Sequence, residues 1–361
     1  MESVKIMESV KTMDLSFYKG KKVLITGHTG FKGSWMSVML VNAGAEVIGY
    51  SLCSKKETRL FDICGIKEQI THIKGDVRDF EHLLAVFREY KPEIVIHMAA
   101  QPLVRLSYEE PVDTYSTNVM GTVNICEAVR QTESVKSFLN VTTDKVYKNN
   151  EWVWGYREDE PLDGYDPYSN SKSCSELVTH CYKNSFFSDG SVAVSTARAG
   201  NVIGGGDFAK DRIIPDCVRA AQKGEDIIVR NPFSVRPYQH VLEPVYAYLM
   251  IAAKQYEDPA CQSWYNVGPD DRDSIETGAL VDLFVKHWGE GLKWVNRYDG
   301  GPHEANFLKL DCSRVKKTFG WQPVWTVKEA MEEIVEWHKA YKDKNDMESV
   351  TLDQIRKYIK E

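Results

Sequence analysis

Short apolar runs typical of strands alternate with helical patterns along the first half of the chain, and this alternation limits the fold more than any other feature. The strand-like runs are residues 21–26, 46–52, 70–74, 94–97 and 138–142. Strands that alternate with helices predict a parallel, doubly wound sheet, and ligands bind such a sheet at the carboxyl ends of its strands. The predicted fold class is α/β, a Rossmann-type doubly wound parallel sheet with a smaller α/β C-terminal substrate domain.

The regular alternation ends near the middle of the chain, and this change predicts the domain boundaries. We expect residues 16–198 to form the large domain, rejoined by about 237–268. Residues 199–236 and 269–361 are expected to form the smaller domain that closes over a substrate. Residues 1–15, which contain the near repeat MESVKI and MESVKT, are expected to be a flexible tail.

Charge and cysteine usage exclude several functional classes. The net charge is -7 and no basic tract stands out, which argues against nucleic acid and against an anionic membrane surface as partners. No run approaches the ~20 apolar residues of a membrane helix, and the N-terminus lacks a signal-peptide core. The eight cysteines form no Cys-x-x-Cys pair, and no metal site is expected. We therefore expect a cytoplasmic protein without zinc or disulfides.

A glycine loop joins the first predicted strand to the first predicted helix. In Gly27-His28-Thr29-Gly30-Phe31-Lys32-Gly33 a glycine stands at every third position. Bare backbone there lets a pyrophosphate approach the helix N-terminus, where free N–H groups and the helix dipole favour an anion. A tight turn with close helix packing would need the same glycines. The position of the loop directly after the first strand favours the dinucleotide site.

The residues alone leave the choice between NAD and NADP open. The second strand ends Tyr50-Ser51-Leu52-Cys53, without the acidic residue that would hold the 2′-hydroxyl of an adenosine ribose. Lys55, Lys56 and Arg59 follow, and they could contact a 2′-phosphate or simply form a solvated surface. Asp76, after the third strand, is placed to accept a hydrogen bond from the adenine amino group.

Tyr168 and Lys172 are the strongest candidates for chemistry. Asp166 and Pro167 predict a helix start, and in that helix the two side chains lie one turn apart. A phenol with a pKa of about 10 becomes a base near neutral pH only if cations stabilise its phenolate, which requires roughly 4 kcal/mol for three pKa units. Lys172 and a bound oxidised nicotinamide could supply that energy. The alternative is an amphipathic helix with Tyr168 in the core and Lys172 in solvent.

Other polar residues follow the predicted strands or the domain boundary. Thr142-Thr143-Asp144-Lys145 stands at the end of the fifth strand, and Asn118 could hold a catalytic lysine or a water, or cap its helix. Arg230 and Arg236 suit a diphosphate, because the planar guanidinium makes two charge-assisted hydrogen bonds. The helices after Asn118 and Tyr168 carry more apolar residues than one buried face requires, which suggests a dimer contact.

The order of GHTGFKG, GDVRD, HMAAQP, TNVMGT, YDPYSNSK and RAGNVIGGGD resembles the nucleotide-sugar members of the extended short-chain dehydrogenase/reductase family, over about residues 16–340. Within that family TTDKVY, EWVWGYRE, DRIIPD, VRPYQHVLEP and PHEANFLKLDCSR are similar to the CDP-glucose 4,6-dehydratases of O-antigen lipopolysaccharide biosynthesis. The resemblance implies NAD as cofactor, CDP-glucose as substrate, CDP-4-keto-6-deoxyglucose as product, and a homodimer or homotetramer.

The resemblance also implies roles for five residues. Tyr168 would take the proton from the sugar's O4, Lys172 would hold the nicotinamide ribose, and Thr143 would hydrogen-bond O4. Asp144 would act as acid toward the C6 oxygen. Lys145 would be the base at C5 or would stabilise the enolate. Related dehydratases acting on dTDP-glucose or GDP-mannose have Glu where Lys145 stands, and a lysine acts as a base only when neutral.

The full candidate site combines these residues with their neighbours. The expected cofactor contacts are Gly27, Thr29, Gly30, Phe31, Lys32, Gly33, Asp76, Val77, Ala99, Ala100, Gln101, Asn118, Thr142, Tyr168, Lys172 and Arg198. The expected substrate contacts are Asn201, Arg212, Ile213, Arg230, Arg236, Arg297 and His303. The competing functions are a nucleotide-sugar 4-epimerase, a 4,6-dehydratase for another nucleotide-hexose and a non-catalytic dinucleotide sensor. The acid and base after Thr143 favour dehydration, since an epimerase needs no groups at C5 and C6.

Overall fold

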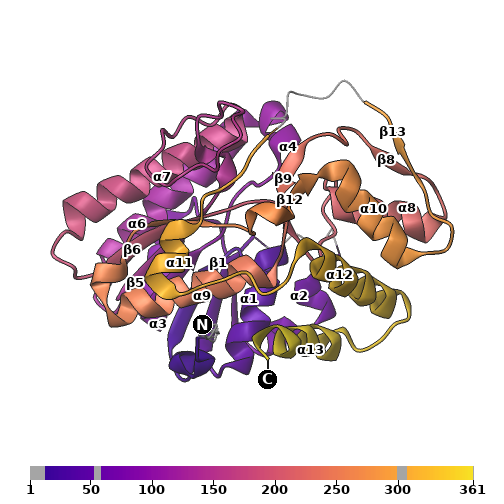
Figure 1. The fold of residues 1–361 in the computed structure, drawn as a ribbon. Coiled ribbons are helices and arrows are strands. Elements are labelled where there is room, and N and C mark those ends of the chain that lie inside the picture. Colours follow the sequence, from indigo (N-terminus) through magenta and orange to yellow (C-terminus); the bar gives the residue numbers. More distant parts are fainter. Residues whose placement is uncertain (1–12, 53–57, 299–306, 361) are drawn as a thin grey trace, which may run out of the picture.

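The computed structural model describes residues 13–52, 58–298 and 307–360, and its centre is one large parallel sheet (Figure 1). The sheet has seven strands in the order β11-β6-β5-β4-β1-β2-β3, and every neighbouring pair is parallel. The strands are β1 (Lys22–Thr26), β2 (Glu46–Ser51), β3 (Thr71–Lys74), β4 (Ile94–His97), β5 (Ser137–Thr143), β6 (Ala193–Ala199) and β11 (Trp264–Val267). The predicted α/β class and doubly wound sheet are confirmed.

The strand order reverses direction between β1 and β4. The chain leaves β1 toward β2 and β3, then returns to the other side of β1 and adds β4, β5, β6 and β11. In the register of this sheet, Thr26 lies opposite Tyr50 on one side and His97 on the other. A crevice opens at such a switch point, beyond the carboxyl ends of the strands, so the topology itself locates a ligand site.

Helices cover both faces of the sheet. The helices α3 (Phe80–Tyr90), α6 (Gly121–Arg130) and α7 (Pro167–Phe186) pack together, and α3 and α6 share a buried core with β1, β4 and β5. The helices α1 (Phe31–Asn42) and α9 (Leu242–Glu257) share a second core with the same strands. Both faces are therefore shielded from water, and the central strands β1, β4, β5 and β6 are almost entirely buried.

The C-terminal half supplies a separate core. Side chains of α8 (Ile213–Lys223), β8 (Ile227–Val229), α10 (Thr277–Trp288) and α12 (Val327–Lys342) pack together, whereas α13 (Met347–Ile359) packs against α1. Small two-stranded sheets pair β10 (Gln239–His240) with β7 (Val202–Ile203), β12 (Ser274–Glu276) with β9 (Val235–Pro237), and β13 (Trp294–Asn296) with β8. The predicted domain boundaries stay predictions.

The remaining elements are short, apart from α11. They are η1 (Leu15–Tyr18), α2 (Leu60–Ile63), η2 (Ile66–Glu68), α4 (Val104–Glu109), α5 (Pro111–Tyr115), the π-helical turn η3 (Ser116–Met120), η4 (Asp144–Val146), η5 (Pro259–Cys261), η6 (Asp271–Asp273) and α11 (Ser313–Phe319). Of the predicted tail, residues 1–12 lie outside the described residues. Tyr18 in η1 is fully buried, and its hydroxyl donates to the carbonyl of Leu249 in α9 at 2.6 Å.

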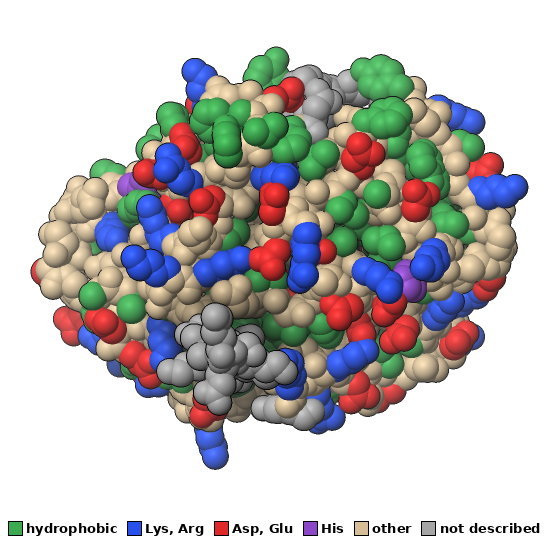
Figure 2. Space-filling view, in the orientation of Figure 1, with side chains coloured by type: hydrophobic (Ala, Val, Ile, Leu, Met, Phe, Trp, Pro, Cys, Tyr) green, Lys and Arg blue, Asp and Glu red, His purple; other side chains and the backbone are tan. Residues whose placement is uncertain are grey.

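Charges of both signs are mixed on the surface. Figure 2 shows Lys and Arg side chains interspersed with Asp and Glu across one face of the molecule, in keeping with the modest net charge of -7. Within the described ranges, no helix is both long and apolar enough to cross a membrane.

Candidate active site

Two adjoining cavities lie at the carboxyl ends of the central strands. The large cavity, of about 670 Å³, is bounded by the end of β5, the start of α7, α4, the loop after β6, and β8 and β9. The small cavity, of about 250 Å³, lies over the glycine loop and the ends of β2, β3 and β4. Residues that line both cavities are Phe31, Lys32, Pro102 and Arg212. A ligand held in one cavity can therefore reach a ligand held in the other.

The three glycines of the loop present bare backbone to the small cavity. Gly27 has a φ of 77°, and a Cβ there would lie 2.8 Å from the backbone nitrogen of Ala99. A Cβ on Gly33 would lie 2.3 Å from the carbonyl oxygen of Gly27. Gly30 is the N-cap of α1 and offers no side chain to the first-turn N–H groups. The helix N-terminus is thus open to an anion, as a pyrophosphate site requires.

Most of the candidate cofactor contacts line the small cavity. These are Gly27, Thr29, Gly30, Phe31, Lys32, Gly33, Asp76, Val77, Ala99 and Ala100. Thr142 and Tyr168 line the large cavity instead. Of the other described candidates, Gln101, Asn118, Lys172, Arg198 and Arg297 lie outside the lining of both cavities.

Asn118 braces the backbone beside the site and does not hold a lysine. Its Oδ1 accepts from the Gln101 N–H at 2.8 Å, and its Nδ2 donates to the Gln101 carbonyl at 3.1 Å and to Ser171 Oγ at 2.9 Å. It stands in the π-helical turn η3, an irregularity that is often found at functional sites. Asn118 thereby ties the segment after β4 to the helix that carries Tyr168.

Arg198 lies away from both cavities, so its position does not support the predicted contact between Arg198 and the cofactor. Its guanidinium is fully buried and donates to Glu176 Oε2, to the Tyr147 hydroxyl and to the Glu158 carbonyl, each at 2.9 Å. A buried arginine needs such partners, and this one joins β6 to α7. Although burial opposes ionisation of Glu176, Arg198 together with His180 and Thr142 holds the pKa of this carboxyl below its usual range.

The end of β2 presents neutral groups to the small cavity. Ser51 and Leu52 line it there, and the Ser51 hydroxyl lies 2.9 Å from Thr29 Oγ1. Lys55 and Lys56 lie outside the described residues, and Arg59 makes an ion pair with Asp62 at 2.8 Å. Asp76 also has a partner, since both of its carboxylate oxygens accept from Arg78.

Tyr168 faces the large cavity from the first turn of α7. Asp166 caps this helix by accepting from the Ser169 N–H at 2.9 Å, as the sequence predicts. The Tyr168 N–H donates to the buried Ser107 hydroxyl of α4 at 3.1 Å, which fixes the helix start. Burial raises the pKa of Tyr168 to about 12, although a hydrogen bond with Thr143 opposes the rise. Tyr168 is therefore a phenol in the free protein.

Lys172 lies behind Tyr168, buried against the sheet. Its Nζ donates to the Val141 carbonyl of β5 at 3.1 Å. Burial lowers the pKa of Lys172 to about 7, with a further contribution from Lys32, while Glu176 opposes the change. The alternative of an amphipathic helix with Lys172 in solvent is therefore wrong, because only 4% of this residue is exposed.

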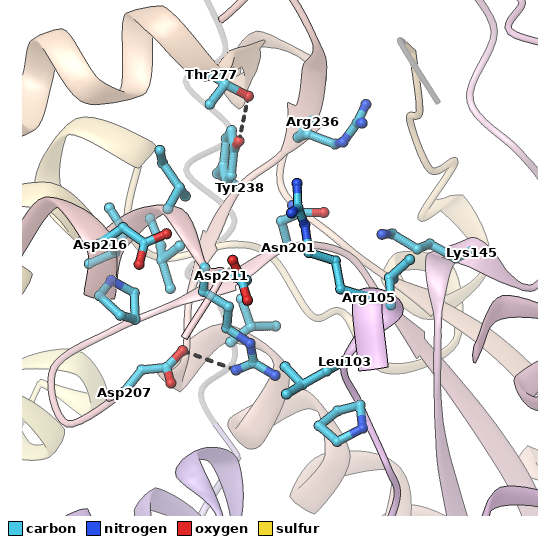
Figure 3. Close-up of a pocket in the computed structure, with 18 of the residues that line it drawn as sticks. Leu103, Arg105, Lys145, Asn201, Asp207, Asp211, Asp216, Arg236, Tyr238 and Thr277 are labelled. Carbon is cyan, nitrogen blue, oxygen red and sulfur yellow. Dashed lines mark hydrogen bonds and ion pairs between the residues drawn. The ribbon is translucent and has the colours of Figure 1, made fainter. Parts of the chain in front are cut away.

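Asp144 and Lys145 begin the 3-10 turn η4, directly after β5. Asp144 is 2% exposed and its Oδ1 accepts from Thr143 Oγ1 at 3.0 Å, while Oδ2 has no hydrogen-bond partner among the described residues. Burial raises the pKa of Asp144, although Lys145, Thr143 and Arg236 oppose the rise. Lys145 is half-buried and lines the large cavity (Figure 3). A carboxyl that tends to hold a proton thus adjoins a lysine and a tyrosine.

Several candidate substrate residues line the far side of the large cavity. They are Asn201, Arg212, Ile213, Arg230 and Arg236. Arg212 pairs with Asp207 at 3.0 Å, and Arg230 pairs with Asp211 at 2.9 Å and with Asp216 at 3.4 Å. Arg297 is exposed, although its neighbour Tyr298 lines the cavity, and His303 lies outside the described residues.

Sequence reasoning missed a group of charged residues that line the large cavity. Arg105 and Glu109 enter from α4, and Asp207, Asp211 and Asp216 stand opposite them. Asp207 ends the GGGD motif and Asp211 and Asp216 follow it, so their proximity to Arg212 in the sequence was the available signal. No comparable sequence signal pointed to Arg105. It lies on the short helix α4, and tertiary packing determines the direction of that helix.

Comparisons with known proteins identify the family. The family described as GDP-mannose 4,6 dehydratase matches residues 24–334. A CDP-glucose 4,6-dehydratase of Salmonella typhimurium is 49% identical over 354 residues, covering 96% of this chain and 98% of the relative. The extent of both matches confirms the resemblance to nucleotide-sugar dehydratases.

Solved structures show the same fold. The dTDP-glucose 4,6-dehydratase of Bacillus anthracis in complex with NAD has a TM-score of 0.76 at 21% identity, covering 91% of this chain and 100% of that chain. A UDP-glucose 4-epimerase of Thermotoga maritima with UDP-glucose has a TM-score of 0.75 at 22% identity, covering 88% of this chain and 99% of that chain. Dehydratases and epimerases therefore share this architecture, and the family match distinguishes them. The chain belongs to the GDP-mannose 4,6 dehydratase family, whose members are nucleotide-sugar dehydratases.

Proposed function

We propose that this enzyme converts CDP-D-glucose to CDP-4-keto-6-deoxy-D-glucose and water, in deoxysugar or O-antigen lipopolysaccharide biosynthesis. The observation that carries the proposal is the position of Asp144 and Lys145 beside Tyr168 in the large cavity. Dehydration requires an acid and a base at C6 and C5, and a 4-epimerase has no use for them. The choice of CDP-glucose is supported by the 49% identical relative that bears this name.

NAD is the proposed cofactor, and the residues of the small cavity fit it. The bare backbone at Gly27 and Gly33 leaves room for a pyrophosphate at the open N-terminus of α1. The Ser51 hydroxyl lines the small cavity and suits a hydrogen bond to a ribose 2′-hydroxyl. Arg59 forms an ion pair with Asp62 instead of being held for a 2′-phosphate, which supports NAD over NADP. The chemistry that NAD supplies when bound is removal of a hydride from C4 and its return to C6.

In this proposal Tyr168 receives the proton of the sugar's O4 while C4 is oxidised. Thr143 holds O4 through its hydroxyl, and Lys172 orients the nicotinamide ribose. Oxidised nicotinamide carries a positive charge, which would lower the pKa of the nearby phenol from about 12. Burial keeps water away from these groups, so each charge acts more strongly than it would in solvent.

A 4-keto group acidifies the proton on C5, and elimination of water from C5 and C6 follows. Lys145 is proposed as the base at C5 or as the stabiliser of the enolate. Asp144 is proposed as the acid that protonates the departing C6 oxygen, and its raised pKa suits that role. Arg236, Arg212 and Arg230 are proposed to bind the nucleotide, with Asn201 and Ile213 beside them, while contacts from Arg297 and His303 stay predictions.

The predicted homodimer or homotetramer and the cytoplasmic location are part of the proposal. Exposed apolar residues support a contact between subunits, because they gather on the neighbouring helices α5, η3 and α7. They are Val112, Tyr115, Met120, Leu177 and Phe186. An isologous dimer would cover this surface in both copies at once.

Mass spectrometry with hexoses carrying deuterium at C4 tests the proposed function. Purified protein is mixed with CDP-, dTDP-, UDP- and GDP-hexoses in the presence of NAD or NADP. We expect loss of one water from CDP-glucose with NAD, with the deuterium recovered at C6. An unchanged mass with inverted configuration at C4 would instead identify an epimerase. Water loss from a different nucleotide-hexose would keep the reaction class and replace the substrate.

Lys145→Ala is expected to lower kcat for water loss by about 10²–10⁴-fold, the usual contribution of a positioned acid or base. Oxidation at C4 should continue, because Tyr168 and Thr143 are unchanged, so reduced cofactor should accumulate in absorbance measurements. Lys148→Ala is a matched control, since Lys148 is an exposed lysine three residues further along the same loop. Full turnover by Lys145→Ala would exclude both of the proposed roles.

A further inference from the structure

One buried carboxylate anchors both ends of the turn η4, which carries the proposed acid and base. This carboxylate is the fully buried side chain of Glu176 in α7. Its Oε1 accepts from the hydroxyl of Thr142, which comes just before the turn. Its Oε2 accepts from Arg198 at 2.9 Å, and Arg198 donates in turn to the hydroxyl of Tyr147, also at 2.9 Å. Because Tyr147 directly follows η4, the chain is held on both sides of the turn.

The same network is tied to two neighbouring strands of the sheet. Glu176 Oε2 also accepts from the hydroxyl of Thr196 in β6 at 2.7 Å. The Tyr147 hydroxyl donates to Asn266 Oδ1 in β11 at 2.6 Å. Each of these side chains, and that of Arg198, is buried. Hydrogen bonds to charged groups are strong and directional where water is absent, so this network fixes the position of the groups that it joins.

The anchoring carboxylate stands on the helix that also carries the residues proposed for oxidation at C4. Tyr168, Lys172 and Glu176 follow one another at intervals of four residues along α7, so they lie on the same side of the helix. The long helix places Tyr168 and Lys172 by its own hydrogen bonds. Asp144 and Lys145 stand instead on a short 3-10 turn, whose position depends on its surroundings. The network therefore links the groups of the first proposed step to those of the second.

We infer that Glu176 and Arg198 are positioning residues for the elimination of water. They hold the turn η4 against α7, so that Asp144 and Lys145 reach C6 and C5 of a sugar whose O4 lies at Tyr168. Both lie outside the lining of the two cavities, so they act through the turn and not on the substrate. Position matters greatly here, because a displacement of about 1 Å can lower a rate by about 10²-fold. This inference rests on the proposed function.

Tyr147→Phe tests the inference, because it removes one hydroxyl from the network and keeps the ring. Replacing Arg198 or Glu176 alone would leave a buried charge without its partner, which strongly destabilises a fold. The enzyme with NAD is mixed with CDP-glucose in a single turnover, and stopped-flow absorbance follows the reduced nicotinamide. Its appearance measures oxidation at C4, and its disappearance measures the return of hydride to C6 after water has left. We expect the ratio of the second rate to the first to fall by about 10–10²-fold.

Tyr156→Phe is the matched control. Tyr156 is a buried tyrosine whose ring stacks on that of Tyr147 with 5.2 Å between the ring centroids. Its hydroxyl lies outside the network, because it accepts from the Asn150 N–H at 2.6 Å and donates to Asn149 Oδ1 at 2.9 Å. The ratio of the two rates in Tyr156→Phe should equal that of the wild type. A smaller folded fraction lowers both signals together and leaves the ratio unchanged, so the ratio reports position and not stability.

An unchanged ratio in Tyr147→Phe would overturn the inference, and so would an equal slowing of both rates. Thr142→Val releases the other end of the turn at nearly constant side-chain shape, and its ratio should fall in the same direction. If Tyr147→Phe does not fold, an unchanged ratio in Thr142→Val overturns the inference instead. These outcomes leave the proposed function in place. A wild-type enzyme that releases water from no nucleotide-hexose would refute the proposed function itself, and the inference with it.

Discussion

Tyr168→Phe is expected to lower kcat by about 10²–10⁴-fold while leaving the affinity for CDP nearly unchanged. The phenol oxygen, which lines the large cavity, is the group proposed to receive the proton of O4, and phenylalanine keeps the ring without that oxygen. Such a loss corresponds to about 3–5 kcal/mol of transition-state stabilisation. The affected step is oxidation at C4, which precedes elimination, so neither reduced cofactor nor the 4-keto sugar should accumulate.

Stopped-flow absorbance of the reduced nicotinamide measures this step directly in a single turnover. Tyr165→Phe is the matched control, because Tyr165 stands three residues earlier in the same segment and is 81% exposed. Calorimetric titration with CDP separates a binding defect from a chemical one. A Tyr168→Phe enzyme that reduces its cofactor at the wild-type rate would show that another group takes the proton, and the proposed role of Tyr168 would be wrong.

The part of the site that the sequence predicted well is the part governed by local rules. The glycine loop needs Gly27 and Gly33 because a Cβ at either would meet backbone, and this requirement is visible as a spacing. The cap of α7 follows from Asp166 and Pro167 in the same way. The parallel sheet follows from the alternation of strands and helices, since helices that connect parallel strands cover both faces of the sheet.

The contacts that the sequence did not predict depend on partners far along the chain. Arg198 lies directly before a Gly-rich segment of the predicted site, yet it meets Glu176 and Tyr147 in the interior. Asn118 reaches Gln101 and Ser171 from the π-helical turn η3, and no residue pattern predicts that turn. Local patterns report what a backbone segment requires, whereas the direction of a long polar side chain is decided by tertiary packing.

Asp144→Asn is expected to lower the rate of water loss by about 10²–10⁴-fold, since an amide matches the carboxyl in size but cannot deliver the proton. Oxidation at C4 should continue, because Tyr168 and Thr143 are unchanged. Sugar that does become oxidised should exchange its C5 proton with heavy water, since Lys145 is intact, and nuclear magnetic resonance would detect that exchange ahead of any 6-deoxy product. Asp163→Asn, at an exposed acid of the following loop, is the control. Water loss from Asp144→Asn at the wild-type rate would mean that the C6 oxygen takes its proton elsewhere, and the proposed role of Asp144 as the acid would be wrong.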